Sequence, residues 1–544
     1  MKFRISGNIV DVIEKKIFPG TIFVDGGVIV EIKREKGKKY SQYILPGLVD
    51  SHIHIESSML SPIEFARNAV KFGTVATISD PHEIANVCGL EGIKFMIDYG
   101  KKTPFKFFFG APSCVPATPF ESSGGALSSK ELNFLFKNYD IFYLSEMMNY
   151  PGVINDEPEV ISKINLAKQL GLPIDGHCPG LVGENLSKYI SYGITTDHET
   201  TTLEEAEEKI LKGMKILIRE GSAAKNLDAL LPLLNKYPEN VMFCTDDLHP
   251  FDLINGHINK FIQKSLKKGF DLFTTLRAAT LNPVLHYNIP VGLLKVGDDA
   301  DFIIIDNFEN FKVVETYIQG KIVYKDRISF IQDTEVEPIN NFYALPKRKD
   351  EIEIRFNGKT KMRIIGIIDG SLITEELHIE GKIENNCVVP DVENDILKII
   401  VVNRYTDTKP SIGFIKNFGL KRGAVASTIS HDSHNIIAIG TNDNDLIESI
   451  NLLIEYKGGI SFTNGNEKIF LPLPIAGLMS TDSIENVSTA YLKIENKIKE
   501  YGSKLTSPLM TLSFMSLLVI PKLKIGDKGL FDVNSFNFVD LFID

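Results

Sequence analysis

The segment LPGLVDSHIHIESSML, residues 45–60, restricts the possible folds of this chain more than any other stretch. Its apolar run ends in His52-Ile53-His54, and alternate side chains of a strand point to the same face. Two imidazoles about 7 Å apart along one strand edge would supply half of a first-row metal site. An isolated His-x-His pair is more often an incidental feature of a polar strand face, so the residues that follow decide between these interpretations.

A helix is expected directly after this strand. Ser61 is a favourable N-cap residue, Pro62 suits the first helical position, and Glu64 is placed to complete a capping box. Metal ligands at the carboxyl end of a parallel strand, just before a helix, lie where α/β barrels keep their active sites. The segment therefore predicts metal ligation by His52 and His54 in an α/β barrel.

Length and composition limit the class of protein. A chain of 544 residues is too long for one hydrophobic core and indicates two or three domains. Hydrophobic residues make up 43% and charged residues 24%, as in an ordinary soluble globular protein. The net charge of −11 argues against a nucleic acid as partner. No apolar run reaches about 18 residues, so no membrane span is expected.

The cysteines and the first residues bear on localisation. The stretch MKFRISGNIVDVIEKK lacks the apolar region and cleavage site of a secretory signal. The five cysteines are scattered without paired spacing, at positions Cys88, Cys114, Cys178, Cys244 and Cys387. This odd number fits a reducing compartment better than a disulfide framework, so a cytoplasmic location is expected.

Residues 45–286 alternate apolar runs with amphipathic helical stretches such as EPEVISKINLAKQLG. The eight apolar runs are YILPGLVDSHIH, TVATISDPHE, FKFFFGAPSC, IFYLSEMMNY, LPIDGHCPG, ITTDHETT, KILIREGSA and VMFCTDDLHP. Eight strand–helix units over this length predict a (β/α)8 TIM-type barrel. The last barrel helix is predicted in DLFTTLRAATLNPVLHY and is expected to end at Asn282-Pro283.

The flanks of the barrel are predicted to be β-rich. Residues 1–44 and 287–334 show β-type runs, and the turn sequence VDGG lies in the first of them. We expect both flanks to form one composite β-sheet domain. Residues 335–349 carry two prolines and no period, which predicts a linker, and residues 350–544 are expected to form an α+β domain.

Ligand-type residues gather at the ends of the predicted barrel strands. Six of the 11 histidines lie there, whereas core or surface histidines would be scattered: His52, His54, His82, His177, His198 and His249. Glu146 and Asp246 end further strands. Imidazoles and carboxylates suit Zn, Mn or Fe, and no cysteine cluster indicates a closed structural zinc site. Two metals bridged by a carboxylate could share a hydroxide and polarise an electrophile, which predicts a hydrolase.

The chain resembles the adenine deaminases of the amidohydrolase superfamily in LPGLVDSHIHIESSM, SDPHEIANV, GHCPGL, TTDHETT and CTDDLHP. The resemblance extends to the C-terminal region through AVASTISHDSHNIIAIG and the GLFDV ending. PGLVDSHIH alone indicates only the superfamily, whereas IESSM with DPHEIANV is more specific. The resemblance implies hydrolysis of adenine to hypoxanthine and ammonia in purine salvage. It also implies two divalent metals per active site, Mn²⁺ in preference to Fe²⁺ or Zn²⁺.

By this resemblance the metal ligands are His52, His54, Glu146, His177, His198 and Asp246. Glu146 would bridge the two metals. The alternative is that Glu146 caps a helix N-terminus or is a solvated acid. Asp246 would touch a metal and move protons between the hydroxide and the substrate. Asp247 ranks second for this role, because its side chain points to the other face if the strand continues.

Further residues are candidate contacts of the substrate. His82 and Glu83 would contact the purine or the leaving ammonia, with a structural role as the equal alternative. Glu121 is a candidate to hydrogen-bond a ring nitrogen, and Ser113 is most simply a turn residue. In the C-terminal domain the candidate residues are His431, Asp432 and His434. Their spacing is compatible with a second metal site, but we favour a role in ordering a loop near the barrel mouth.

Two other functions are compatible with the same sequence. A cyclic-amide hydrolase of the dihydropyrimidinase or hydantoinase kind would use the same dinuclear site with a different pocket shape. A metal-binding relic is disfavoured because no ligand position is lost. Adenine and water are the expected substrates, and a homo-oligomer, a dimer or larger, is the expected assembly.

Overall fold

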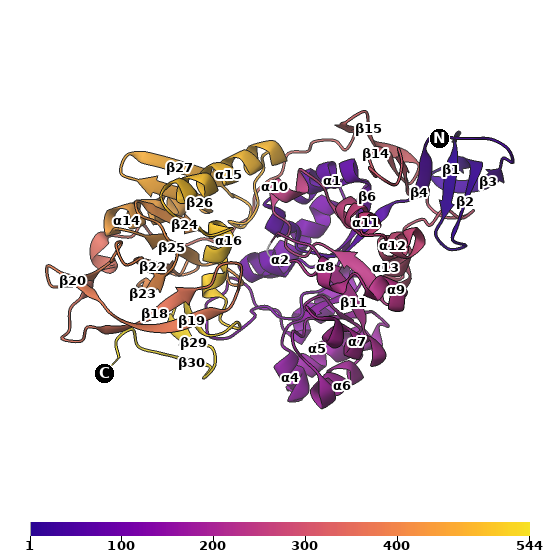
Figure 1. Ribbon diagram of the computed structural model, residues 1–544. Helices are drawn as coiled ribbons and strands as arrows, with labels where there is room; N and C mark the ends of the chain where they lie inside the picture. Colours follow the sequence, from indigo (N-terminus) through magenta and orange to yellow (C-terminus); the bar gives the residue numbers. More distant parts are fainter. Residues whose placement is uncertain (1, 223, 544) are drawn as a thin grey trace. The chain divides into compact units, whose positions relative to one another are not determined.

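The computed structural model describes residues 2–222 and 224–543, which divide into two compact units (Figure 1). The first unit comprises Met1–His82, Ile93–Cys114 and Leu127–Val336. The second unit comprises Glu83–Gly92, Val115–Ala126 and Glu337–Asp544. This division does not test the three predicted domain boundaries, which stay a prediction. None of the described helices has the length and apolar character needed to cross a membrane.

One sheet of the first unit joins both flanks of the central segment, in the order β16-β15-β14-β13-β4-β1-β2-β3. Its strands are β1 (Lys2–Asp11), β2 (Lys16–Asp25), β3 (Val28–Arg34), β4 (Tyr43–Pro46), β13 (Phe302–Ile305), β14 (Val313–Ile318), β15 (Lys321–Lys325) and β16 (Ile328–Ser329). β4 connects the flanks, because it pairs in parallel with β1 and antiparallel with β13. Ile22, Ile44 and Phe302 pack together in the core beside this sheet.

Each of the eight predicted apolar runs contains a strand. These strands are β5 (Leu48–Ile53), β6 (Thr74–Ser79), β7 (Lys106–Phe109), β8 (Leu144–Met147), β9 (Ile174–Gly176), β10 (Thr196–Asp197), β11 (Lys215–Arg219) and β12 (Val241–Cys244). They form three parallel groups, β5-β6-β7, β8-β9 and β10-β11-β12. Parallel bridges also link Ala111 to Leu144 and Ile53 to Asp246, so the carboxyl ends of the strands lie close together.

Helices connect these strands. They are α1 (Pro62–Ala69), α2 (His82–Gly100), α3 (Ser129–Asn138), α4 (Tyr150–Ile154), α5 (Pro158–Gln169), α6 (Gly183–Ser191), α7 (Leu203–Leu211), α8 (Leu227–Leu230), α9 (Leu233–Lys236), α10 (Pro250–Leu253), α11 (Ile258–Lys267), α12 (Leu272–Ala278) and α13 (Leu281–Tyr287), with 3-10 turns η1 (Ile55–Ser58) and η2 (Val70–Phe72). At α1 the Glu64 N–H donates to Ser61 Oγ at 3.3 Å, as predicted for the N-cap. The Glu64 carboxylate bonds to Arg67 and Asn68, so it is engaged on the helix itself.

The predicted end of the last barrel helix was wrong. α12 ends at Ala278, and a second helix, α13, begins at Leu281 and includes Pro283. The N–H groups of a helix's first turn have no intrahelical acceptor, so proline is tolerated there. Pro283 therefore lies in the first turn of a helix and does not end one.

The second unit contains an eight-stranded sheet in the order β19-β18-β23-β22-β25-β24-β26-β27. Its strands are β18 (Lys361–Ile367), β19 (Thr374–Glu380), β22 (Ile396–Val402), β23 (Ser411–Lys416), β24 (Ala424–Ser427), β25 (Ile436–Gly440), β26 (Gly459–Asn464) and β27 (Glu467–Pro472). The remaining elements are β17 (Ile354–Arg355), β20 (Lys382–Glu384), β21 (Cys387–Val389), β28 (Leu523–Gly526), β29 (Gly529–Asp532), β30 (Asn537–Phe538), α14 (Asp443–Glu455), α15 (Ile484–Glu500), α16 (Pro508–Ser513), η3 (Lys349–Glu351) and η4 (Phe514–Ser516).

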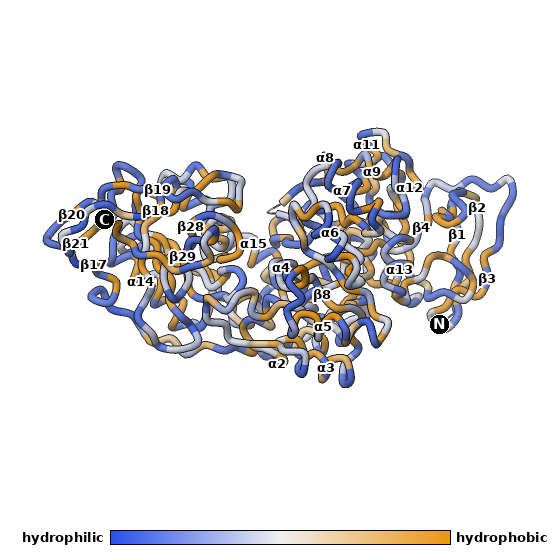
Figure 2. Tube along the Cα trace, turned by 90° about the horizontal axis from the view of Figure 1, so that it is seen from below, coloured by the Kyte–Doolittle hydropathy of each residue, from blue (hydrophilic) through white to orange (hydrophobic). Residues whose placement is uncertain are grey.

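The core of the second unit lies between this sheet and α14, where Ile400, Ile436, Leu446 and Leu453 are fully buried. Apolar residues recur about every fourth position along α14, which gives this helix one buried face. The turn between β20 and β21 is hydrophilic by contrast (Figure 2), whereas Val388 of β21 is buried. The second unit thus has an apolar core with an exposed polar turn at residues 385–386.

Candidate metal centre

His52 and His54 lie at the end of β5, with their ring centroids 4.9 Å apart. Backbone bonds to the end of β12 fix both residues, since the Asp246 N–H donates to His52 O at 2.9 Å and the His54 N–H donates to Asp246 O at 3.1 Å. The Nδ1 of His54 is 3.1 Å from the Asp80 carbonyl oxygen. An N–H at that position leaves the Nε2 lone pair free for a cation.

Glu146, in β8, lies at the centre of the imidazoles and is 3% exposed. Its Oε1 is 3.3 Å from His54 Nε2 and 3.8 Å from His52 Nε2. Its Oε2 is 2.6 Å from His177 Nδ1 and 3.2 Å from His198 Nε2. The two oxygens of one carboxylate thus face two different pairs of imidazoles, which is the arrangement that a bridge between two cations requires.

His177 and His198 follow β9 and β10. Gly176 permits this approach, because a Cβ there would lie 2.3 Å from the Thr196 carbonyl oxygen of the neighbouring strand. The His198 ring stacks on His52, with centroids 4.1 Å apart and an interplanar angle of 19°. Strands that are far apart in sequence therefore bring their imidazoles into contact.

Asp246 follows β12 in a left-handed backbone conformation, with φ of 58°. Its Oδ1 is 3.1 Å from His54 Nε2 and 3.4 Å from His52 Nε2, and its Oδ2 pairs with Arg219. Asp247 has a different neighbour, because its Oδ1 accepts a hydrogen bond from Ser57 at 2.6 Å. The structure therefore brings Asp246 into the imidazole cluster, while the bond from Ser57 connects Asp247 to the turn after β5.

Electrostatics keep the carboxylates ionised despite their burial. Burial alone would raise the pKa of Glu146, but the His177 and His198 imidazoles hold it well below its usual range. Burial would likewise raise the pKa of Asp246, and the Arg219 guanidinium holds it well below its usual range. Burial and the neighbouring His198 lower the pKa of His52, whereas the Asp246 and Glu146 carboxylates outweigh burial and raise the pKa of His54.

Three side chains of the cluster were not predicted from the sequence: Asp80, Glu199 and Arg219. Asp80 groups with His54 and Glu146, and Glu199 groups with His177 and His198. Arg219 ends β11 and pairs with both Glu199 and Asp246. Each lies at or just after a strand end, and Asp80 and Glu199 also adjoin motif residues; these positions are the only signal that the sequence offers for them.

Two of the predicted substrate contacts lie in the first unit. The His82 Nδ1 is 3.5 Å from Glu146 Oε1 and 3.3 Å from Asp80 Oδ2, so this imidazole borders the cluster. The Ser113 hydroxyl donates to the Glu146 backbone oxygen at 2.5 Å, which supports the end of β8. Their assignment to the substrate stays a prediction.

The other predicted residues belong to the second unit. Glu83 contacts His431 and His434 there, and Asp432 lies beside His431. Glu121 is buried, and burial together with the Asp432 carboxylate raises its pKa well above the usual range. The predicted contacts of Glu83 and Glu121 with a purine stay predictions.

His52 tests whether the residues of the first unit fit a metal pair. It is fully buried, and neither of its ring nitrogens makes a well-formed hydrogen bond among the described residues. Such an orphaned imidazole is costly unless a cation or another partner satisfies it. His52 groups with His54 and Asp246 on one side and with Glu146 and His198 on the other. The donor set therefore fits two divalent cations.

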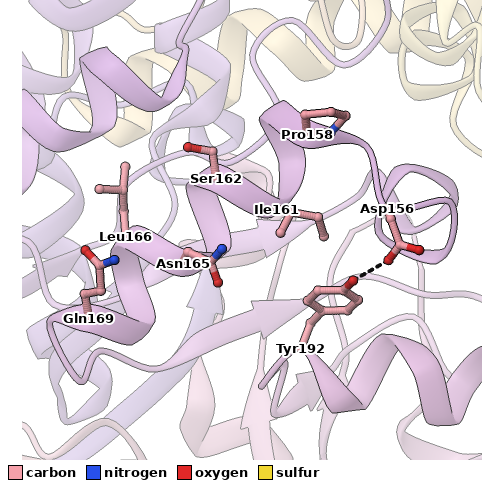
Figure 3. A pocket seen from close by; sticks show the side chains of 8 residues that line it. All are labelled: Asp156, Pro158, Ile161, Ser162, Asn165, Leu166, Gln169 and Tyr192. Atoms are coloured by element: carbon pink, nitrogen blue, oxygen red, sulfur yellow. Dashed lines mark hydrogen bonds between the residues drawn. The ribbon is translucent and has the colours of Figure 1, made fainter.

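A surface groove of the first unit lies over α5 and has different chemistry. Figure 3 shows its lining, in which the Tyr192 hydroxyl donates to Asp156. The remaining lining residues are Pro158, Ile161, Ser162, Asn165, Leu166 and Gln169. None of these residues is among the candidate ligands, so the groove is not part of the metal centre.

Comparisons with known proteins agree with this chemistry. Residues 43–323 match the amidohydrolase family, and residues 371–537 match the adenine deaminase C-terminal domain. The chain is 51% identical to an adenine deaminase of Methanosarcina mazei over 550 residues, covering 99% of both chains. It is 50% identical to an adenine deaminase of Borreliella afzelii over 551 residues, again covering 99% of both.

Proposed function

The chain belongs to the adenine deaminase family of amidohydrolases, and from this premise we propose that it hydrolyses adenine to hypoxanthine and ammonia. The observation that carries the proposal is Glu146, whose two oxygens face two pairs of imidazoles at the strand ends. Full-length relatives at about half identity favour adenine over a cyclic amide as substrate.

We propose that β5 to β12 close into a (β/α)8 barrel. Contacts between the three parallel groups support the closure: the Ala111–Leu144 bridge, the 3.0 Å bond from Thr195 N–H to Ile174 O, and the Ile53–Asp246 bridge. Taken in order, these pairings connect the eight strands into a ring. The ligands would then lie at the carboxyl face, where barrel enzymes keep their active sites.

Two divalent metals, Mn²⁺ in the first place, would be held by His52, His54, Glu146, His177, His198 and Asp246. Imidazole and carboxylate donors suit Mn²⁺, Fe²⁺ and Zn²⁺ alike. A bound metal pair lowers the pKa of water toward neutrality and polarises the atom under attack. Glu146 would contribute a negative charge to both cations, and the ring nitrogens of His52, which make no well-formed hydrogen bond among the described residues, would gain a partner.

Asp246 is placed to move the protons. Arg219 holds its Oδ2, so that Oδ1 is directed toward His54. Asp246 takes a proton as water attacks C6 of adenine and delivers it to the exocyclic amine. The C6–N bond then breaks, ammonia leaves, and the remaining hydroxyl proton moves to a ring nitrogen to give hypoxanthine. His82, beside Glu146, is proposed to contact the purine or the leaving ammonia.

The test is the release of ammonia and hypoxanthine from adenine by the purified chain supplied with Mn²⁺. We expect the two products in equal amounts. A dihydropyrimidine or a hydantoin offered in place of adenine should stay intact. Ring opening of those compounds, with adenine unchanged, would overturn the proposal and favour a cyclic-amide hydrolase.

We also propose a cytoplasmic location. All five cysteines are free in the described structure, which fits a reducing compartment. The homo-oligomer expected from the sequence stays a prediction. Light scattering on the purified chain measures its mass, and a monomer at all concentrations would exclude a dimer or a larger assembly.

A further inference from the structure

Three side chains with metal-ligating groups meet in the second unit, at the start of α2 and in the loop 428–435: Glu83, His431 and His434. The His431 Nδ1 is 2.9 Å from Glu83 Oε1, and the His434 Nε2 contacts Glu83 Oε2. Their exposures are 3% for Glu83, 6% for His431 and 1% for His434. One carboxylate thus faces two buried imidazoles.

The start of α2 is held firmly. Residues 122–125 pack on it, and the Gly125 N–H donates to the Asn86 carbonyl oxygen at 3.0 Å. A Cβ at Gly125 would lie 2.2 Å from the Ala85 carbonyl oxygen, so only glycine permits this close approach. The backbone that carries Glu83 therefore has little freedom to move.

The loop is held as firmly on its side. The His434 N–H donates to Ser430 O at 2.7 Å, and the His431 N–H donates to Ser513 O at 3.0 Å. The His431 ring stacks on Phe514, with centroids 4.5 Å apart and an interplanar angle of 12°. Both imidazoles are therefore oriented before any ligand binds, which lowers the entropy cost of binding.

Further carboxylates lie near the cluster. The Asp432 Oδ1 is 3.8 Å from His431 Nδ1. Glu121 is 5% exposed, interacts electrostatically with Asp432, and has an Oε1 that accepts no hydrogen bond among the described residues. Buried carboxylates are stable when a cation compensates them. The surroundings thus favour a bound positive charge.

We propose that Glu83, His431 and His434 bind one divalent first-row cation. Two imidazoles and one carboxylate suit Zn²⁺ or Mn²⁺, and three protein ligands leave coordination positions for water. The Ser430 N–H is 3.4 Å from His434 Nδ1, beyond the usual range of about 2.7–3.2 Å. Such a long contact does little to keep the lone pair on Nδ1. His434 can therefore carry its proton on Nδ1, which leaves the Nε2 lone pair free for the cation.

The test is the metal content of the full chain after saturation with Zn²⁺, or separately with Mn²⁺, and removal of free metal. His434→Gln should bind one equivalent less than the unchanged chain. His378→Gln is the matched control, because His378 lies in the same unit, is half exposed and pairs with Glu376 at 2.7 Å. The control should keep the full metal content. Equal metal content in His434→Gln and the control would overturn the proposal.

A second pair of variants separates this site from the metal centre of the first unit and guards against misfolding. Glu146→Gln, which impairs that centre, should still bind one equivalent more than Glu146→Gln/His434→Gln, with both chains folded by circular dichroism. The proposal does not rest on deamination, so a chain inactive on adenine that shows this difference would still support it. No difference between the two variants would overturn it.

Discussion

The two ligand clusters use a carboxylate in different ways. Glu146 presents one oxygen to the two imidazoles of β5 and the other to those that follow β9 and β10. Glu83 presents each oxygen to a single imidazole, and both imidazoles come from one loop. The donors around Glu146 are therefore enough for two cations, and those around Glu83 for one.

The clusters also differ in how their side chains are held in place. In the first unit Asp246 is oriented by Arg219, which itself pairs with Glu199. In the second unit the imidazoles are fixed by backbone bonds and by stacking on Phe514. Ligand type alone thus does not distinguish a hydrolytic centre from a structural one. We propose that the difference lies in a carboxylate shared by two cations and in an oriented proton acceptor.

The largest expected effect comes from Glu146→Gln, which removes the charge that the two cations are proposed to share. Glutamine keeps the volume but cannot bridge two dications, so the metal pair should bind weakly. Turnover of adenine should fall on the order of 10⁴-fold or more, because the pKa of free water is far above that of metal-bound water. Metal analysis and steady-state kinetics check this result. Full metal content with full turnover would show that Glu146 is not the bridge.

Asp246→Asn should separate metal binding from catalysis. Asparagine tolerates the left-handed backbone at φ of 58° and still offers a carbonyl oxygen to a metal. It cannot accept a proton near neutral pH, so turnover should fall on the order of 10²-fold or more with near-normal metal content. Asp247→Asn is the matched control and should cost much less, because Asp247 bonds to Ser57. If the control is the inactive variant, the proton acceptor is misassigned.

Much of this cluster could be predicted from the sequence because strand ends carry their own signals. His52, His54, His177 and His198 each lie at the end of an apolar run, and alternation within one strand gives His52 and His54 a common direction. Arg219 also closes a run, but its pairing with Asp246 depends on the order of strands in space. Neither propensity nor spacing contains that order.

The second cluster was harder to predict for the same reason. Glu83 and His431 are 348 residues apart, and their contact depends on the packing of residues 83–92, the part of α2 that belongs to the second unit. The sequence singled out both residues but gave no reason to place them together. The local sequence does not predict the break between α12 and α13, because proline is compatible both with the end of a helix and with the first turn of the next one.

Arg219→Met should have an intermediate effect and tests whether orientation of Asp246 matters. Methionine leaves the buried Asp246 and the half-buried Glu199 without the guanidinium that pairs with both. Loss of a side chain that holds a metal ligand in place typically costs about 10–100-fold in activity or metal affinity. Kinetics of Arg219→Met against Arg67→Met, whose arginine pairs with Glu64 on α1, check the effect. Equal turnover in both variants would show that Asp246 needs no such support.

The smallest effect concerns the packing behind the second cluster. The Lys524 Nζ donates to the Phe514 carbonyl oxygen at 3.0 Å, and the Phe514 ring lies on His431. Burial lowers the pKa of Lys524 to about 7. Between pH 7 and the ordinary pKa range of lysine, Lys524 is protonated in the unfolded chain but neutral in the folded chain. The unfolded chain therefore binds more protons, so the free energy of unfolding should rise with pH in this range.

Lys524→Met should remove this rise, which amounts to at most about 1.4 kcal/mol per pH unit. Urea unfolding at pH 7 and pH 9 measures it. Lys522→Met is the matched control, because Lys522 is exposed and should leave the pH dependence unchanged. A rise of the same size in Lys524→Met would place its origin elsewhere in the chain.

The central claim is that two metals at the Glu146 cluster support the deamination of adenine. Metal-free protein carrying His434→Gln, so that the second cluster takes up none, is titrated with Mn²⁺ while ammonia release from adenine is followed. Turnover should rise until two equivalents are bound and then stay constant, with hypoxanthine formed in step with ammonia. A constant rate after one equivalent, or no ammonia at any ratio, would contradict the account.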